Sequence, residues 1–135
     1  MMKKVISLIV LTILLISCKK EVTTPTSGIF RGRFEMTGFN GGGIETGACT
    51  IALNDKTRSF SLSVDDAESV AYPSSGTYTI SNPIEMSFAS KQMPIANTNP
   101  HILLDPIYTC KFDDTSFEIT KIIDTIKYDY KFLRY

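Results

Sequence analysis

The sequence predicts an all-β domain over residues 28–135, folded as an antiparallel up-and-down barrel of about eight strands. Three observations support this fold class. Short segments alternate between apolar and polar residues, Thr, Ile, Phe and Tyr are frequent in them, and turn-forming residues separate them. A two-sheet sandwich would give the same one-sided alternation. The barrel is favoured because closure leaves no exposed edge strand.

Eight segments carry the alternation, and each has one apolar face. They cover residues 30–36, 49–53, 59–64, 77–80, 84–88, 108–112, 117–120 and 126–132. Turn chemistry lies between them: residues 54–56 predict a tight hairpin, and residues 81–83 and 113–114 predict further turns. The only long gap, residues 89–106, is open to two interpretations. It is either a lid over one mouth of the barrel or an apolar plug that completes the core.

The first residues have the layout of a secretory signal peptide. Two lysines precede an apolar run over residues 5–17, which is shorter than the roughly 20 residues of a membrane-spanning helix. The run ends in Leu-Ile-Ser-Cys at 15–18, which resembles a lipobox. The resemblance implies cleavage between Ser17 and Cys18, diacylglycerol on the Cys18 sulfur and an acyl chain such as palmitate on the new amino terminus. Several chains anchor a protein stably, so we expect a lipid-anchored protein of the cell envelope, at the outer membrane. The alternative is an ordinary cleaved signal with an incidental cysteine.

Residues 18–27 are then the lipidated cysteine and a polar, threonine-rich linker to the domain. Charged residues after an acylated cysteine resemble a surface-export signal of Bacteroidetes, but Lys19 and Lys20 make this one less acidic, so the periplasmic and surface sides both stay open. Removal of residues 1–17 leaves 118 residues, enough for one domain, and takes away two lysines, which lowers the net charge from zero to −2. Without a basic run, we expect no nucleic-acid partner and no second, electrostatic contact with a membrane.

Four motifs follow one another in the domain. It opens with Gly-x-aromatic-x-Gly-x-aromatic at 28–34, and a Ser-Gly-Thr-Tyr strand start lies at 75–78. A leucine-rich stretch leads into a tyrosine-bearing strand at 101–108, and Tyr-x-Leu-like residues end the chain at 130–135. In this order the motifs resemble the small lipoproteins of Bacteroidetes with a calycin-like or lipocalin-like barrel, most of which have no assigned function. The resemblance covers most of residues 28–135 and implies that barrel here.

Phe30 and Arg134 are a candidate pair at the floor of the barrel. Lipocalins proper carry a tryptophan at the start of the first strand, with a basic residue of the last strand packed on it, and the resemblance puts Phe30 and Arg134 in these places. Strand geometry supports the pair independently. In a closed antiparallel meander the start of the first strand meets the end of the last, and both residues fall on the inward parity. A cation–π contact there would contribute about 1 kcal/mol; the alternative is a solvated Arg134.

Residue types that serve in catalytic and metal sites are present, but they do not form the motifs of such sites. His101 is the only histidine, no serine lies in a nucleophile elbow, and the Cys and His residues are too scattered for zinc. The acidic pairs at 65–66 and 113–114 lack calcium-loop spacing, and the glycines at 41–43 lack the Lys-Ser/Thr and helix of a phosphate loop. We therefore expect solvated turns and a hairpin at these places, no catalytic residues, no metal, no cofactor and no enzyme activity.

Cys49 and Cys110 both fall on the apolar parity, on the second and sixth predicted strands. These strands lie across the barrel from each other, and a disulfide needs Cα atoms within about 7 Å. We expect two free, buried thiols, with a single disulfide as the alternative.

The predicted interior is rich in large rings, and this leaves two hypotheses for its function. An eight-stranded barrel is just wide enough to be filled by side chains or to hold one small ligand. The first hypothesis is a cavity for a small apolar or amphipathic ligand. The second is a filled core that acts through its outer face as an interaction partner or inhibitor of another envelope protein. The candidate cavity residues are Phe34, Phe60, Tyr78, Phe88, Tyr108, Tyr128 and Tyr130.

Overall fold

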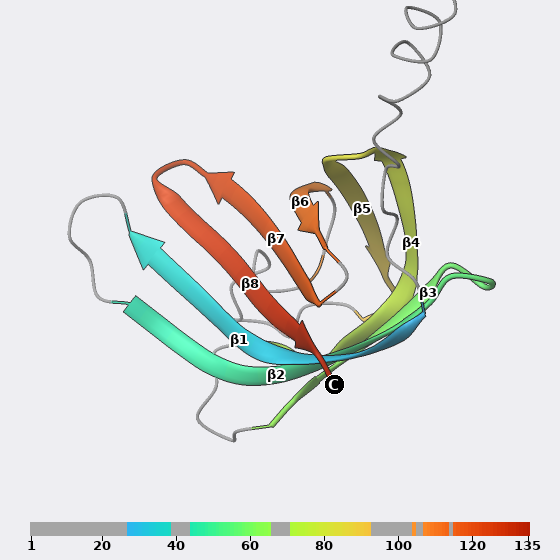
Figure 1. Ribbon diagram of the computed structural model, residues 1–135. Coiled ribbons are helices and arrows are strands. Elements are labelled where there is room, and N and C mark those ends of the chain that lie inside the picture. Colours follow the sequence, from blue (N-terminus) through green and yellow to red (C-terminus); the bar gives the residue numbers. More distant parts are fainter. Residues whose placement is uncertain (1–26, 39–43, 66–70, 93–103, 105–106, 114) are drawn as a thin grey trace, which may run out of the picture.

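The chain folds as a closed barrel of eight antiparallel strands, in which each strand pairs with its neighbours in the sequence and the last pairs with the first (Figure 1). The computed structural model describes residues 27–38, 44–65, 71–92, 104, 107–113 and 115–135. The predicted all-β class and the barrel are therefore confirmed, and the barrel is compatible with a lipocalin-like fold. Its strands are β1 (Gly28–Gly38), β2 (Ile44–Asn54), β3 (Ser59–Val64), β4 (Ser74–Asn82), β5 (Glu85–Ser90), β6 (Ile107–Phe112), β7 (Ser116–Ile123) and β8 (Ile126–Arg134).

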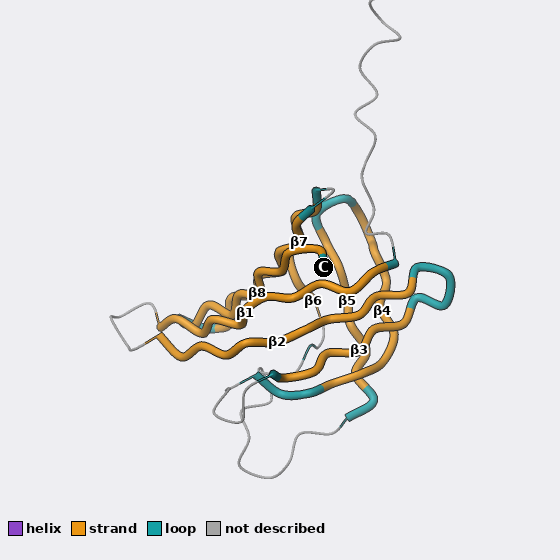
Figure 2. Tube along the Cα trace, turned by 60° about the horizontal axis from the view of Figure 1, so that its bottom comes forward, coloured by secondary structure: helices purple, strands orange, loops and turns teal. Residues whose placement is uncertain are grey.

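Closure comes from a long ladder between β1 and β8. It runs from Phe30 opposite Arg134 to Gly38 opposite Ile126. The tube trace shows strands and connections only (Figure 2). Among the described residues, none forms a helix that is long and apolar enough to cross a membrane. Since the ring of strands closes within residues 28–134, this part of the chain contains a complete barrel and can be studied on its own.

The up-and-down order gives the barrel two different ends. One, here called the turn end, carries the short connections 55–58, 83–84 and 113–115 together with the start of β1 and the end of β8. The other, the loop end, carries the connections 39–43, 65–73 and 91–106 together with the two-residue turn 124–125. The strands thus place all the longer connections at one end of the interior.

Side-chain caps hold the short turns at the turn end. The Asn54 Oδ1 accepts hydrogen bonds from the backbone N–H groups of Lys56 and Thr57, each at 3.1 Å, as expected of an Asx turn. Asp113 caps the turn before β7 in the same way: it accepts bonds from the backbone N–H groups of Thr115 at 2.8 Å and Ser116 at 2.6 Å, and from both hydroxyls. Asp113 thus lies exposed in a turn, as predicted, and its carboxylate also organises that turn.

The alternation predicts most of the core correctly, with two exceptions. Ile84 was placed on the apolar face of a strand, but β5 begins one residue later and Ile84 is 64% exposed in the turn. Asp129 falls on the polar, outward parity of residues 126–132, and it does face outward. It is nevertheless 4% exposed, because Lys127, Lys131 and Thr120 pack around its carboxylate.

Two glycines of the sequence motifs stand where two strands approach closely. A Cβ added to Gly32 would lie 1.8 Å from the carbonyl oxygen of Lys131 on β8, and one added to Gly76 would lie 2.0 Å from that of Ala89 on β5. Both clashes are with backbone, which cannot move aside as a side chain can. The motifs thus require glycine where the backbone of the neighbouring strand approaches closely.

Candidate ligand site in the barrel interior

The seven predicted cavity residues all lie buried inside the barrel, at most 3% exposed. Six of them form one connected series of ring contacts. Its centroid distances are 5.1 Å for Phe60–Phe88, 6.4 Å for Tyr78–Phe88, 5.7 Å for Phe88–Tyr108, 6.2 Å for Tyr108–Tyr130 and 4.7 Å for Phe34–Tyr130. The seventh, Tyr128, is next to Lys121 on the adjacent strand.

The turn half of the interior is an apolar aromatic stack centred on Phe117. This ring lies parallel to Phe112 at 4.5 Å and to Phe132 at 5.6 Å, and meets Phe30 edge-on at 5.9 Å. Such offset and edge-on pairs contribute about 0.5–1.5 kcal/mol each beyond burial. The turn half therefore has the character of a packed protein core.

The Phe30–Arg134 pair closes this half. The two residues face each other across β1 and β8, and the Arg134 guanidinium lies 5.3 Å from the centre of the Phe30 ring. The same guanidinium donates a hydrogen bond of 3.2 Å to the carbonyl oxygen of Ser27. The strand-parity argument thus gives the right position for both residues, although Arg134 remains exposed to solvent at the rim.

The loop half has a different composition, since it contains a buried cation. Lys121 on β7 is 8% exposed, and its ammonium lies 4.6 Å from the centre of the Tyr108 ring and 5.7 Å from that of Tyr128. Aromatic faces attract a cation, and more strongly where water is excluded. An ammonium also has three donor hydrogens, so it can serve more than one acceptor at once.

Two buried hydroxyls add polarity to the interior. The Oγ of Ser74, at the loop-end start of β4, has no hydrogen-bond partner among the described residues. The Arg58 guanidinium of the β2–β3 turn lies beside the ring of Tyr78, 5.8 Å from its centre. Buried polar groups in native proteins are almost always paired with protein, water or ligand. Ser74 is therefore a place where a polar group of a ligand, or ordered water, can be held.

The phenol of Tyr130 and the two thiols are neutral at physiological pH. Burial raises the pKa of Tyr130 well above its usual value. Burial likewise raises the pKa of Cys49 to about 12 and that of Cys110 to about 11, and the nearby Asp65 carboxylate raises the Cys49 value further. Both cysteines are free and buried, as predicted. Inert thiols of this kind act as small hydrophobes rather than as nucleophiles.

Several predicted features lie outside the described residues. These are the signal region with Ser17 and Cys18, His101, the glycines at 41–43, and Asp66 and Asp114 of the acidic pairs. Of the apolar residues in the long gap, Leu104 is described and fully buried in the core, while residues 93–103 lie outside. Among the described residues, no group of three His, Cys, Asp or Glu side chains could hold a metal ion.

Lys121 is an interior residue that is missing from the predicted cavity residues, although its position in the sequence indicates that it faces inward. Lys121 follows Phe117 and Ile119 at a spacing of two, and therefore falls on the same inward parity. Charged residues are rarely buried without a specific environment. An inward lysine in an otherwise apolar series thus indicates a polar site inside the barrel.

No protein-family model matches the chain, and no curated protein or solved structure matches it either.

Proposed function

We propose that the protein is a lipid-anchored lipoprotein of the bacterial cell envelope, with a lipocalin-like barrel that binds a small amphipathic ligand in the loop half of its interior. The observation that carries this proposal is the ammonium of Lys121, buried inside the barrel beside Tyr108 and Tyr128. Small-molecule sites typically combine apolar walls with a few convergent polar groups. The loop half has this combination, with Lys121 and Ser74 as the polar groups.

Native mass spectrometry of residues 19–135, purified from cells without a tag, tests the binding function. We expect a co-purifying small molecule on the wild-type chain. Lys121→Gln and Ser74→Ala should each reduce its occupancy, whereas Lys111→Gln should not, since Lys111 points outward from β6 and is exposed. A wild-type chain that carries no ligand, and takes up neither decanoic acid nor decanol when these are added, would refute the proposal.

A filled-core barrel that acts on an envelope protein is the second candidate, and the ring series from Phe60 to Phe34 favours it. These rings cross the interior in mutual contact, as expected if side chains fill an eight-stranded barrel. The same experiment separates the two candidates. A wild-type chain that carries no ligand and binds neither decanoic acid nor decanol would favour the filled core.

The lipid anchor has a separate test, because it depends on Cys18 alone. In cells labelled with palmitate, the wild-type chain should take up label and partition with the outer membrane. Cys18→Ala should take up none, remain uncleaved and lose that partition. If the variant partitions with the outer membrane as well as wild type, the anchor proposal is wrong.

A further inference from the structure

The outer face of the barrel at β6, β7, β8 and β1 gathers cations that are far apart in the sequence. Lys111 pairs across the strands with Glu118, Glu118 with Lys131, and Lys131 with Arg33. Arg31 lies two residues further along β1, towards the turn end, opposite Leu133. The four cations share one face, here called the basic face, of a domain whose net charge is slightly negative. Three carboxylates lie among or beside them: Glu118 between Lys111 and Lys131, and Glu35 and Asp129 on the loop-end side of Lys131. Arg31 and Arg33 therefore carry the cationic part of this face towards the turn end.

The pairing of Arg33 with Lys131 puts two like charges directly opposite each other. Such a pair is unfavourable in an antiparallel ladder. Lys131 is compensated by Glu35, whose carboxylate accepts its hydrogen bond at 3.0 Å. Arg33 is exposed and has no ion pair among the described residues. The pairing of Arg33 with Lys131 costs stability within the barrel. This cost is explained if Arg33 binds an anion outside the barrel.

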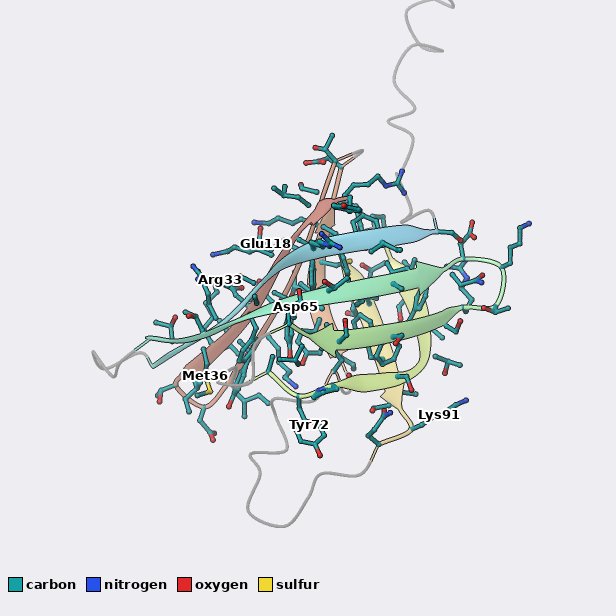
Figure 3. The ribbon with its side chains drawn as sticks, turned by 90° about the horizontal axis from the view of Figure 1, so that it is seen from below. Arg33, Met36, Asp65, Tyr72, Lys91 and Glu118 are labelled. Atoms are coloured by element: carbon teal, nitrogen blue, oxygen red, sulfur yellow. The ribbon has the colours of Figure 1, made fainter. Side chains whose placement is uncertain are left out.

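The basic face is hollowed as well as charged. A groove of about 570 Å³ is lined by Arg31, Arg33, Lys131, Glu118 and Leu133. Figure 3 shows Arg33 and Glu118 on the same flank of the barrel, and Lys91 on the far side.

Exposed apolar side chains border the cations towards the turn end. Leu133 is 67% exposed, Tyr135 78% and Ile29 50%. The Arg31 guanidinium lies over the Tyr135 ring, 3.8 Å from its centre, and the Tyr135 N–H donates to the carbonyl of Ile29 at 3.0 Å. Arg and Lys beside exposed aliphatic and aromatic side chains are typical of surfaces that lie in the interface of a bilayer.

The N-terminal segment meets the barrel at this same end. The Ser27 hydroxyl accepts a hydrogen bond of 2.9 Å from the backbone of Asp55 in the β2–β3 turn, and Arg134 at the end of β8 donates to the Ser27 carbonyl. Residues 19–27 separate Cys18 from β1, and nine residues span about 30 Å at most. A surface to which Cys18 is tethered would therefore be within reach of the basic face.

We propose that the basic face docks the barrel on a membrane of anionic phospholipid, with Arg31 and Arg33 at the headgroups and Leu133 and Tyr135 in the interface. Docking by this face directs the turn end towards the bilayer and leaves the loop end free. It goes beyond the proposed ligand function and does not depend on it.

Binding of residues 19–135, which lack Cys18, to vesicles tests the docking without the lipid anchor. The wild-type chain should bind vesicles of mixed phosphatidylglycerol and phosphatidylcholine, and bind less as salt is raised. It should not bind pure phosphatidylcholine vesicles. Arg31→Gln/Arg33→Gln should weaken the binding about tenfold or more, and Leu133→Ser should weaken it at an unchanged salt dependence.

The matched control for Arg33→Gln is Lys91→Gln, which removes the same charge from an exposed site at the loop end, away from the basic face. Circular dichroism of each variant checks that the barrel is folded, and Arg33→Gln alone avoids the contact between Arg31 and Tyr135. Two results would overturn the proposal: a wild-type chain that does not bind the anionic vesicles, or equal weakening by Arg33→Gln and Lys91→Gln, which would reveal a net-charge effect only.

Discussion

The two halves of the barrel interior are built from the same strands but differ in chemistry. The turn half is aromatic, with Phe117 in contact with three other phenylalanines. The loop half buries the ammonium of Lys121 and the hydroxyl of Ser74. Packed apolar rings stabilise the fold, whereas a buried polar group costs stability unless it is hydrogen-bonded or paired. Buried polar groups that break the apolar pattern are expected at functional sites. On this comparison we expect stability to come mainly from the turn half, and the proposed binding lies in the loop half.

The largest effect is expected at Gly32, in the wall of the turn half. In Gly32→Ala the new Cβ would overlap the Lys131 carbonyl, so β1 and β8 would have to separate at the closing seam. We expect a loss of more than about 5 kcal/mol in the free energy of unfolding, measured with urea, because a backbone clash of this size cannot be relieved by a side chain. Gly28→Ala is the control, since its Cβ would meet the movable Arg134 side chain at 3.2 Å. Equal effects of the two changes would contradict the role given to Gly32.

The next effect compares a side chain from each half. Phe117→Ala should cost about 3–5 kcal/mol, because it leaves a large cavity at the centre of the aromatic stack. Met36→Ala, at a partly buried residue of β1 in the loop half (Figure 3), should cost clearly less. Thermal and urea unfolding measure both. If Met36→Ala costs as much as Phe117→Ala, stability is not concentrated in the turn half.

The strand pattern predicts the turn half more completely than the loop half, for a physical reason. Aromatic residues on one parity identify an inward face, so the positions of Phe30, Phe117 and Phe132 follow from the alternation. The environment of Lys121 depends instead on which rings the register brings beside it, and those rings come from β6 and β8. Parity alone gives the direction of a side chain, not its neighbours.

The outer face was harder still to predict. Arg33 and Lys131 are 98 positions apart in the sequence and adjacent in the barrel, so the basic face leaves no basic run to be recognised. The expectation of no electrostatic membrane contact rested on that missing run. The hydrogen bonds that Asp113 accepts could not be predicted either. A turn sequence indicates a bend, but it does not show which oxygen accepts the hydrogen bonds of the turn N–H groups.

A smaller effect is expected where the turn half is closed. A double-mutant cycle of Phe30→Leu and Arg134→Gln should give a coupling of about 0.5–1 kcal/mol, since the contact is cation–π at an exposed rim. Phe30→Leu alone also loses buried area, and Arg134→Gln alone also loses the hydrogen bond to Ser27. The cycle cancels both of these contributions and leaves the coupling between the two side chains. A coupling near zero would mean that the two side chains are neighbours without an energetic contact.

The smallest effect depends on pH and lies in the turn before β7. Hydrogen bonds from Ser116 and Thr115 lower the pKa of Asp113 from 3.8 to about 2. A carboxylate whose pKa is lower in the folded state stabilises the fold above its unfolded pKa, and this contribution is lost as the pH falls through the folded pKa. Wild type should thus be more stable than Asp113→Asn at pH 7, and the difference should shrink between about pH 4 and pH 2. Urea unfolding at a series of pH values measures this difference.

Ser116→Ala, which removes the largest contribution to the lowered pKa of Asp113, should shift this loss of stability to higher pH. A difference between wild type and Asp113→Asn that stays constant from pH 7 to pH 2 would show that the charge of Asp113 has no part in holding the turn.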